Sequence, residues 1–226
     1  MTAHKPRRLP HKGFEEHCKR CTLNADFSAS HAKEWKKMEI VPFSFVRLLF
    51  FVIVTLVFLS LSWKALQNPR CHGFYRFFAF EGILFLVLYN HPFWFTDVFA
   101  PQQIVSWLLL TASILFVIQG QHLLRKIGGE RPRADSPENL AFENTTALVT
   151  EGIYRYIRHP MYSSLLLLTW GAFLKHFSLP GLAVALATTV LLFIVGRIEE
   201  QENLAFFGPV YQEYRKSTKM FLPFAL

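Results

Sequence analysis

The chain has 226 residues, of which 52% are hydrophobic and 18% are charged, and its mean hydropathy is +0.25. Soluble domains carry about 25% charged residues, so this composition argues against a soluble enzyme. The net charge of +8 does not indicate a nucleic-acid partner. Many of the Lys and Arg residues precede Glu39 and most others lie between apolar segments, which favours anchoring beside lipid headgroups.

Five apolar segments approach the roughly 20 residues that a helix needs to cross a bilayer. Glu81 lies inside the second of these segments and must face protein or water rather than lipid. Only a short connection separates the last two segments, which predicts an antiparallel helical hairpin. The five segments are residues 40–63, 74–89, 101–119, 160–174 and 179–196.

The segments predict an all-α polytopic membrane protein with about five transmembrane helices. A basic polar tail (1–39) precedes three helices (40–120), and a C-terminal region (121–226) holds a polar connector, the hairpin and an amphipathic segment. Because the hairpin returns to its starting side, the polar segments 121–158 and 197–226 should meet on one face and form a site there. The positive-inside rule makes that face cytoplasmic.

The basic tail conflicts with this topology, since five spans would place it on the opposite side of the membrane. Two explanations remain open. Either the tail is an exception to the rule, or one of the first two apolar segments lies in the interface without crossing.

The densest polar cluster lies where the connector meets the hairpin, in residues 152–162. Pro160 suits the first position of a helix, so Arg158 and His159 should stand at a helix N-terminus that can receive a carboxylate or phosphate. Tyr162 lies about one turn further along the same face. The alternative is an interfacial belt of Arg, His and Tyr that only sets the depth of the helix.

A second cluster contains Glu199, Glu200 and Glu202, at the far end of the hairpin. Carboxylates at a helix C-terminus oppose the helix dipole. Either the helix continues as a solvated acidic face, or Glu199 or Glu200 binds a cation such as an ammonium or sulfonium group. Beyond them, Gly208-Pro209 should break the helix before a short amphipathic piece, which is either a lid or an interfacial anchor.

Other site motifs are weak or missing. His17-Cys18-Lys19-Arg20-Cys21 has one Cys pair without regular His spacing, so we predict no metal site. Soluble-type dinucleotide, phosphate-loop and metalloprotease motifs do not occur in the sequence.

The two clusters together resemble a known family. Gly152-x-Tyr154-x-x-x-Arg158-His159-Pro160-x-Tyr162, an apolar hairpin, and Glu199-Glu200-x-x-x-Leu204-x-x-Phe207-Gly208-x-x-Tyr211-x-x-Tyr214 with a closing Pro223 are similar to the integral-membrane methyltransferases typified by isoprenylcysteine carboxyl methyltransferase, which include phospholipid methyltransferases. The resemblance covers about the last 80 residues. It implies a methyltransferase that uses S-adenosylmethionine, releases S-adenosylhomocysteine, and acts on a lipophilic carboxylate, thiol or amine acceptor in the membrane.

The resemblance also implies roles for individual residues. Arg158, His159 and Glu199 are expected to be catalytic, and Arg197 and Glu200 to lie beside the acceptor. Eukaryotic members have a substrate-contacting Arg where this chain has Val195, which argues against a prenylated-cysteine acceptor. The cofactor contacts are expected at Asn139, Ala147, Leu148, Val149, Tyr154, His159, Tyr162 and Glu199.

Two other functions remain open on the sequence. One is a membrane reductase of the sterol type that takes hydride from NADPH, for which Arg131, Arg133, Arg155 and Arg158 are the candidate contacts of the 2′-phosphate. The other is a membrane assembly protein without enzymatic activity.

Overall fold

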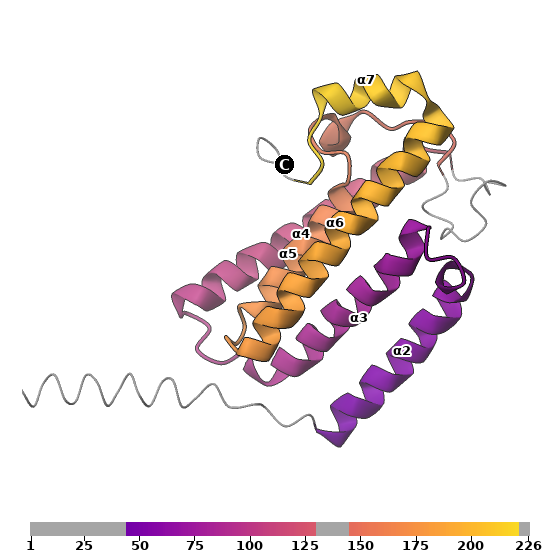
Figure 1. The fold of residues 1–226 in the computed structure, drawn as a ribbon. Coiled ribbons are helices and arrows are strands. Elements are labelled where there is room, and N and C mark those ends of the chain that lie inside the picture. Colours follow the sequence, from indigo (N-terminus) through magenta and orange to yellow (C-terminus); the bar gives the residue numbers. More distant parts are fainter. Residues whose placement is uncertain (1–43, 130–144, 222–226) are drawn as a thin grey trace, which may run out of the picture. The chain divides into compact units, whose positions relative to one another are not determined.

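The computed structural model describes residues 44–129 and 145–221, so the basic tail with Cys18 and Cys21, as well as Asn139 and Pro223, lie outside the described residues. Within these two ranges the structure is helical, with two short 3-10 turns and one isolated bridge (Figure 1). The prediction of an all-α protein is confirmed. The helices are α2 (Phe45–Leu66), α3 (His72–Asn90), α4 (Pro101–Ile127), α5 (Pro160–Phe173), α6 (Leu179–Phe207) and α7 (Pro209–Ser217).

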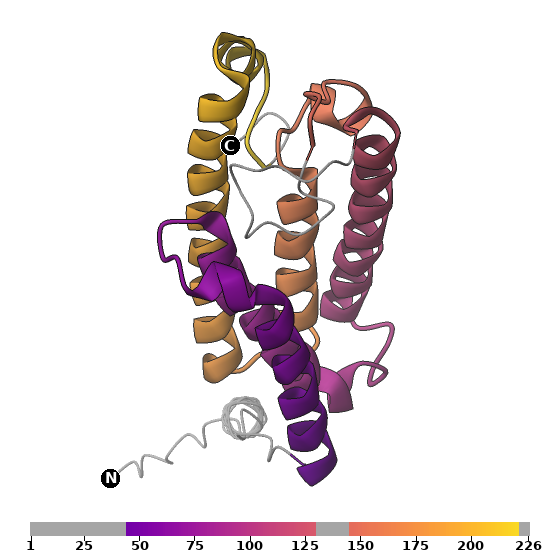
Figure 2. The same ribbon diagram turned by 90° about the vertical axis from the view of Figure 1, so that its right-hand side faces the viewer.

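Each of the five predicted apolar segments forms one helix, α2 to α6 in chain order. Helices α4 and α6 run beyond the predicted ends at residues 119 and 196, because each continues through polar residues until a glycine, Gly128 or Gly208, follows it. Helices α2, α4 and α6 are long and apolar enough to cross a membrane. Helix α5 has 14 residues and rises only about 21 Å. It lies between α4 and α6 (Figure 2).

Helices α4 and α5 pack through small residues, as helices in membranes commonly do. The Ser106 hydroxyl donates to the carbonyl of Gly171 at 2.7 Å, and the Ser113 hydroxyl donates to the carbonyl of Ser164 at 2.8 Å. On the outer face of α4 the side chain of Leu108 is 65% exposed. Small polar residues inside and large apolar residues outside are the arrangement expected of a helical bundle in lipid.

The acidic residue inside α3 faces protein, as predicted. The Thr55 hydroxyl of α2 donates to Glu81 Oε2 at 2.8 Å. Arg47, near the start of α2, donates to the carbonyl of Leu88 of α3 at 3.2 Å. These two hydrogen bonds join α2 to α3. Most of the other side chains of α2 are apolar, and many of them are exposed.

The chain segments before α5 and after α7 run side by side. Ile157 and Lys219 form an isolated parallel bridge. The N–H of Arg158 donates to the carbonyl of Lys219 at 2.8 Å, and the N–H of His159 donates to the carbonyl of Met220 at 3.1 Å. The prediction that the two polar segments meet at one end of the hairpin is confirmed, and this junction positions the site.

Candidate active site

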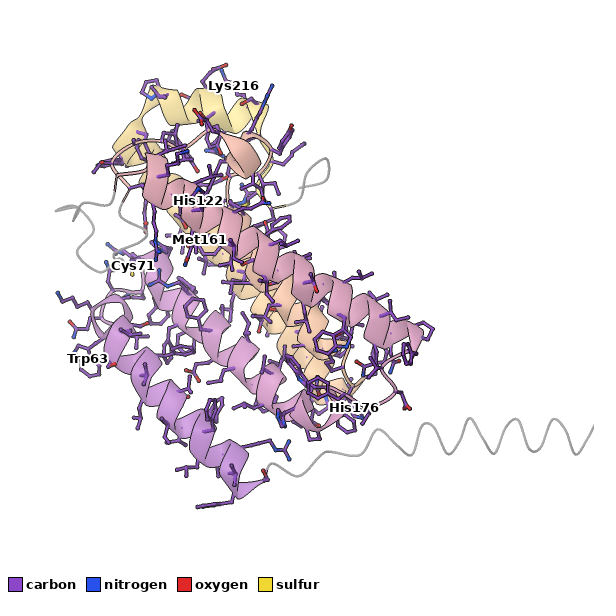
Figure 3. All side chains as sticks on the ribbon, turned by 180° about the vertical axis from the view of Figure 1, so that it is seen from behind. Trp63, Cys71, His122, Met161, His176 and Lys216 are labelled. Atoms are coloured by element: carbon purple, nitrogen blue, oxygen red, sulfur yellow. The ribbon has the colours of Figure 1, made fainter. Side chains whose placement is uncertain are left out.

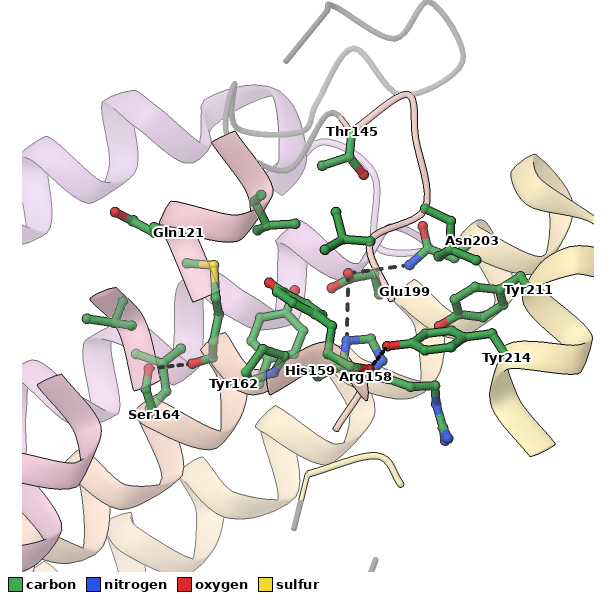
Figure 4. A pocket seen from close by; sticks show the side chains of 18 of the residues that line it. Gln121, Thr145, Arg158, His159, Tyr162, Ser164, Glu199, Asn203, Tyr211 and Tyr214 are labelled. Carbon is green, nitrogen blue, oxygen red and sulfur yellow. Dashed lines mark hydrogen bonds and ion pairs between the residues drawn. The ribbon is translucent and has the colours of Figure 1, made fainter. Parts of the chain in front are cut away.

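A cavity of about 330 Å³ lies at this junction, bounded by α3, α4, α5, α6, α7 and the segment before α5. Figure 4 shows its side chains from close by: Glu199, Asn203, Tyr211 and Tyr214 gather on one side, and Gln121 and Ser164 lie on the other. The first side is polar and the second is largely apolar. A volume of this size suits a small-molecule ligand.

Local backbone chemistry brings the polar wall together. Gly152 has φ +59°, and a Cβ there would lie 2.7 Å from Leu123 Cδ1, so the turn (η3, Gly152–Arg155) that leads to Tyr154 requires glycine. Gly208 has φ +63° and separates α6 from α7. The predicted helix break at Gly208-Pro209 is therefore confirmed, and it turns Tyr211 of α7 back over the cavity.

Arg158 forms the central ion pair of the site. Its Nη2 lies 2.6 Å from Glu200 Oε1, its Nε donates to the same oxygen at 2.7 Å, and Nη1 donates to the carbonyl oxygens of Arg215 and Thr218. Glu200 is 2% exposed, so both charges are largely removed from water. A guanidinium held on three nitrogens is a rigid, oriented group at the cavity wall.

His159 lies between two carboxylates. Its Nδ1 is 3.7 Å from Glu199 Oε1, and its Nε2 is 3.8 Å from Glu200 Oε1. The ring stacks on Tyr162 with centroids 5.5 Å apart. His159 Nε2 and Tyr211 Oη are buried, line the cavity, and have no hydrogen-bond partner among the described residues. Buried polar atoms are normally satisfied, so these two indicate a polar ligand.

Three tyrosines complete the polar wall. The Tyr214 hydroxyl donates to the carbonyl of Tyr154 at 2.5 Å, which joins α7 to the turn before α5. Burial raises the pKa of Tyr154, Tyr211 and Tyr214 well above the usual value, and the charge of Glu199 raises the pKa of the first two further. All three therefore remain neutral phenols that can donate hydrogen bonds.

The three predicted acidic residues of α6 have three different environments. Glu199 lines the cavity, where Asn203 Nδ2 donates to its Oε1 at 3.5 Å; Glu200 pairs with Arg158, and Glu202 Oε2 lies 2.6 Å from His72 Nδ1 of α3. Because α6 continues to Phe207, the carboxylates do not stand at the end of the helix dipole. Helix continuation is confirmed, but the face is not uniformly solvated, because Glu200 is buried.

The apolar half of the cavity brings in α3 and α4. Phe80, Val117, Leu124 and Leu165 line it. Arg76 of α3 also lines it, is only 1% exposed, and has Nη1 3.5 Å from His72 Nε2. Glu202 can accept from His72 Nδ1, and Nε2 of a neutral His72 ring can accept from Arg76.

Most residues that the sequence singled out line this cavity, including Arg158, His159 and Glu199. Ala147 does not: it is exposed, and its N–H donates to the carbonyl of Gly128 at 3.0 Å. Glu200 is behind the wall, and Arg197 borders a second cavity. Asn139 is outside the described residues. The remaining predicted contacts that line the cavity are Leu148, Val149, Tyr154 and Tyr162.

Sequence reasoning missed several lining residues. Arg76 is the most important, and its charge inside the second apolar segment could have identified it, as Glu81 was identified. Asn203 lies one turn after Glu199 on the same face of α6, which the spacing of four could also have indicated. Thr145 and Gln121 carry no comparable signal in the sequence.

Comparisons with known proteins find similarity to methyltransferases. The phospholipid methyltransferase family model matches residues 136–209. Human protein-S-isoprenylcysteine O-methyltransferase is 34% identical over 135 residues, which are 57% of this chain and 46% of the human protein. Protein-S-isoprenylcysteine O-methyltransferase A of Arabidopsis thaliana is 38% identical over 85 residues, 37% of this chain and 43% of the relative.

The name of a third relative states a different substrate. Methanethiol S-methyltransferase of Pseudomonas deceptionensis is 32% identical over 71 residues, 31% of this chain and 26% of the relative. The chain thus spans less than half the length of each of these relatives. No solved structure matches the chain significantly. Residues 136–209 contain Tyr154, Arg158, His159 and Glu199, so the part of the chain that is similar to the phospholipid methyltransferase family contributes residues to the cavity wall.

Proposed function

We propose that the protein is an S-adenosylmethionine-dependent methyltransferase that methylates a lipophilic acceptor at the cytoplasmic face of a membrane. The observation that supports this proposal is the composition of the cavity wall. The carboxylate of Glu199 and the start of helix α5 share its polar wall, and an apolar wall faces them. A charged cofactor and a lipophilic acceptor need these two environments side by side.

The residues of the polar wall match the charges of the cofactor. The ammonium of its amino-acid end would pair with Glu199, and its carboxylate would lie against His159 at the N-terminus of α5, where the helix dipole favours an anion. Tyr211 Oη, which is buried without a hydrogen-bond partner among the described residues, would gain a polar partner. The faces of Tyr154 and Tyr162 contact the cationic part of the cofactor. Leu148 and Val149 cover its less polar parts.

Arg158 and Glu200 act through position in this proposal. The guanidinium is already bound to Glu200 and to two backbone carbonyls, so it orients the segment before α5 and adds positive potential beside the carboxylate seat. Glu200 is a positioning residue because its oxygens face Arg158 and Arg215. Arg197 does not line this cavity, so the proposal gives contact with the acceptor to the residues of the apolar wall and not to Arg197.

When bound, the cofactor supplies an electrophilic methyl group on a sulfonium, and transfer to the acceptor needs no covalent enzyme intermediate. The acceptor lies along the apolar wall at Phe80, Val117 and Leu165, where water is excluded. Arg76 faces the same space and favours an anionic acceptor, a carboxylate or thiolate, over an ammonium. The protein's contribution is alignment of the two reactants.

The cytoplasmic orientation rests on the charges around the site. Arg125, Lys126, Arg215 and Lys216 flank the helix ends at the cavity, whereas the connection between α3 and α4 contains no Lys or Arg. Positive residues collect on the cytoplasmic side of membrane proteins.

Calorimetric titration of the purified protein tests the cofactor. We expect saturable binding of S-adenosylmethionine and S-adenosylhomocysteine, and none of NADPH. NADPH binding without S-adenosylmethionine binding would favour a membrane reductase instead. If none of these ligands binds while the protein keeps a cooperative thermal transition, a non-enzymatic role in the membrane is favoured.

A labelled methyl donor then identifies the acceptor. The protein is incubated with the donor and a native membrane extract, and lipids and small molecules that gain one methyl group are found by mass spectrometry. A Glu199→Ala variant, matched for expression, is the control. Products in equal amount with both proteins would count against the proposed site.

A further inference from the structure

A second cavity, of about 280 Å³, lies behind the first, on the other side of Arg158. It is bordered by cations from three segments: Arg197 of α6, Arg215 of α7, and Lys219 of the segment after α7. Phe193 and Met220 form its apolar border. Methyl transfer as proposed above uses neither Arg197 nor Lys219.

Positive charge exceeds negative charge at this cavity. Glu200 is paired with Arg158 at 2.6 Å and lies 3.4 Å from Arg215 Nη2, and both of these arginines line the cavity. Neither Arg197 nor Lys219 has a carboxylate within ion-pair distance in the part of the chain that the structure describes. One acidic group therefore serves four cations, which leaves the cavity attractive to an anion.

The position of the second cavity along α6 indicates how deep this cavity lies in the membrane. Leu186 and Val190 are 49% and 57% exposed, and Phe193 and Arg197 follow at helical spacing on the same face. Arg197 is the first charged residue of α6. An apolar stripe that faces lipid thus ends at a cluster of cations, as expected at the level of phospholipid headgroups.

We propose that this cavity binds the phosphate of an anionic phospholipid, with Arg197, Arg215 and Lys219 around the phosphate and the acyl chains along Phe193, Val190 and Leu186. Guanidinium and ammonium groups are strong phosphate donors. A zwitterionic headgroup brings its own cation to a site that already has an excess of them. The site therefore selects for net negative charge.

The bound lipid also braces the first cavity. The carbonyls of Lys219 and Met220 accept from the N–H groups of Arg158 and His159, and the carbonyl of Phe221 accepts from the Ser163 hydroxyl at 2.6 Å. A phosphate held by Lys219 fixes the segment that carries these acceptors. Lipid binding should accordingly raise the thermal unfolding midpoint of the full chain.

Native mass spectrometry of the delipidated full-length protein tests the site, with phosphatidylglycerol and phosphatidylcholine as probes. We expect retention of phosphatidylglycerol, and about tenfold or more weaker retention in the double variant Arg197→Gln/Lys219→Gln. The matched control is Lys64→Gln/Arg70→Gln, which also removes one lysine and one arginine charge, but from exposed positions outside the cavity. This variant should retain the lipid.

Three results would overturn the proposal. One is equal retention of both lipids, and another is equal loss in the cavity variant and its control. The third concerns the source of the phosphate: inorganic phosphate that raises the unfolding midpoint as much as phosphatidylglycerol does would assign the cavity to a free anion. None of these readouts depends on methyltransferase activity, so they leave the proposed function to its own tests.

Discussion

Two cations mark the opposite ends of the helical bundle, and the protein holds them differently. Arg158 lies at the cavity end and pairs with Glu200. Lys175 follows α5 at the other end, where Nζ lies 3.6 Å from the ring centroid of Trp107 and donates to Gln103 Oε1 at 3.1 Å. Figure 3 shows the separation of the two ends through His176, next to Lys175, and Lys216 of α7.

The difference separates a site from a structural clamp. At the cavity end Glu200 pairs with Arg158, whereas the neighbouring carboxylate of Glu199 lines the cavity. At the other end Lys175 is 1% exposed and has no carboxylate within ion-pair distance among the described residues, so aromatic faces and a neutral amide satisfy it. A charge surrounded in this way holds helices together but offers nothing to a ligand.

The largest expected effect comes from removing the partner of Arg158. Glu200→Ala leaves a buried guanidinium without its carboxylate and should lower the free energy of unfolding by about 3 to 5 kcal/mol, measured by denaturant unfolding in detergent. Arg158→Met/Glu200→Leu should recover most of this loss while cofactor binding stays weak. A Glu200→Ala protein as stable as the Glu213→Ala control, whose side chain is 77% exposed, would contradict the assignment.

Glu199 sharpens the comparison, because it is the acidic group that lines the cavity without an Arg or Lys partner among the described residues. Glu199→Ala should remove a charge-assisted contact worth about 1.5 to 3 kcal/mol and weaken S-adenosylmethionine binding roughly ten- to a hundredfold, measured by calorimetry. The unfolding midpoint should change little. Unchanged affinity would remove Glu199 from the cofactor site.

At the clamp end, Lys175→Met should lower the free energy of unfolding by about 1 to 3 kcal/mol, because Gln103 Oε1 loses its donor. Cofactor affinity should remain within about twofold of wild type. Weakened cofactor binding in a variant that retains its unfolding midpoint would break the distinction between the two ends.

Lys175 should also make stability depend on pH. Burial lowers the pKa of Lys175 below its usual value of 10.5. The unfolded chain then binds this proton more tightly, so the residue's contribution to the free energy of unfolding rises as pH increases toward 10.5. The difference in stability between wild type and Lys175→Met should therefore grow over that range. A constant difference would count against a buried, charged Lys175.

The smallest expected effect concerns the hydrogen bond that joins α7 to the turn before α5. Tyr214→Phe removes the donor to the Tyr154 carbonyl and should weaken cofactor binding about two- to tenfold by loosening the polar wall. Tyr156→Phe, at a position that is 56% exposed, is the matched control. Equal affinities in the two variants would show that α7 does not shape the site through this bond.

Local sequence chemistry by itself determined where the helices lie and where they break. The apolar segments predict α2 to α6 because lipid requires long apolar helices, Pro160 begins α5, and Gly208-Pro209 ends α6. The junction at Arg158 and His159 was also predictable, because a hairpin returns the chain to its starting side. Such features depend on neighbours in sequence.

Only the tertiary structure decided which side chains share an environment. Glu199 and Glu200 are adjacent in sequence, but successive helix residues point about 100° apart, so one faces the cavity and the other Arg158. Arg76 joins the site from α3, and Lys219 and Met220 complete it from the far end of the chain. Helix packing sets these long-range distances, and no local pattern in the sequence records them.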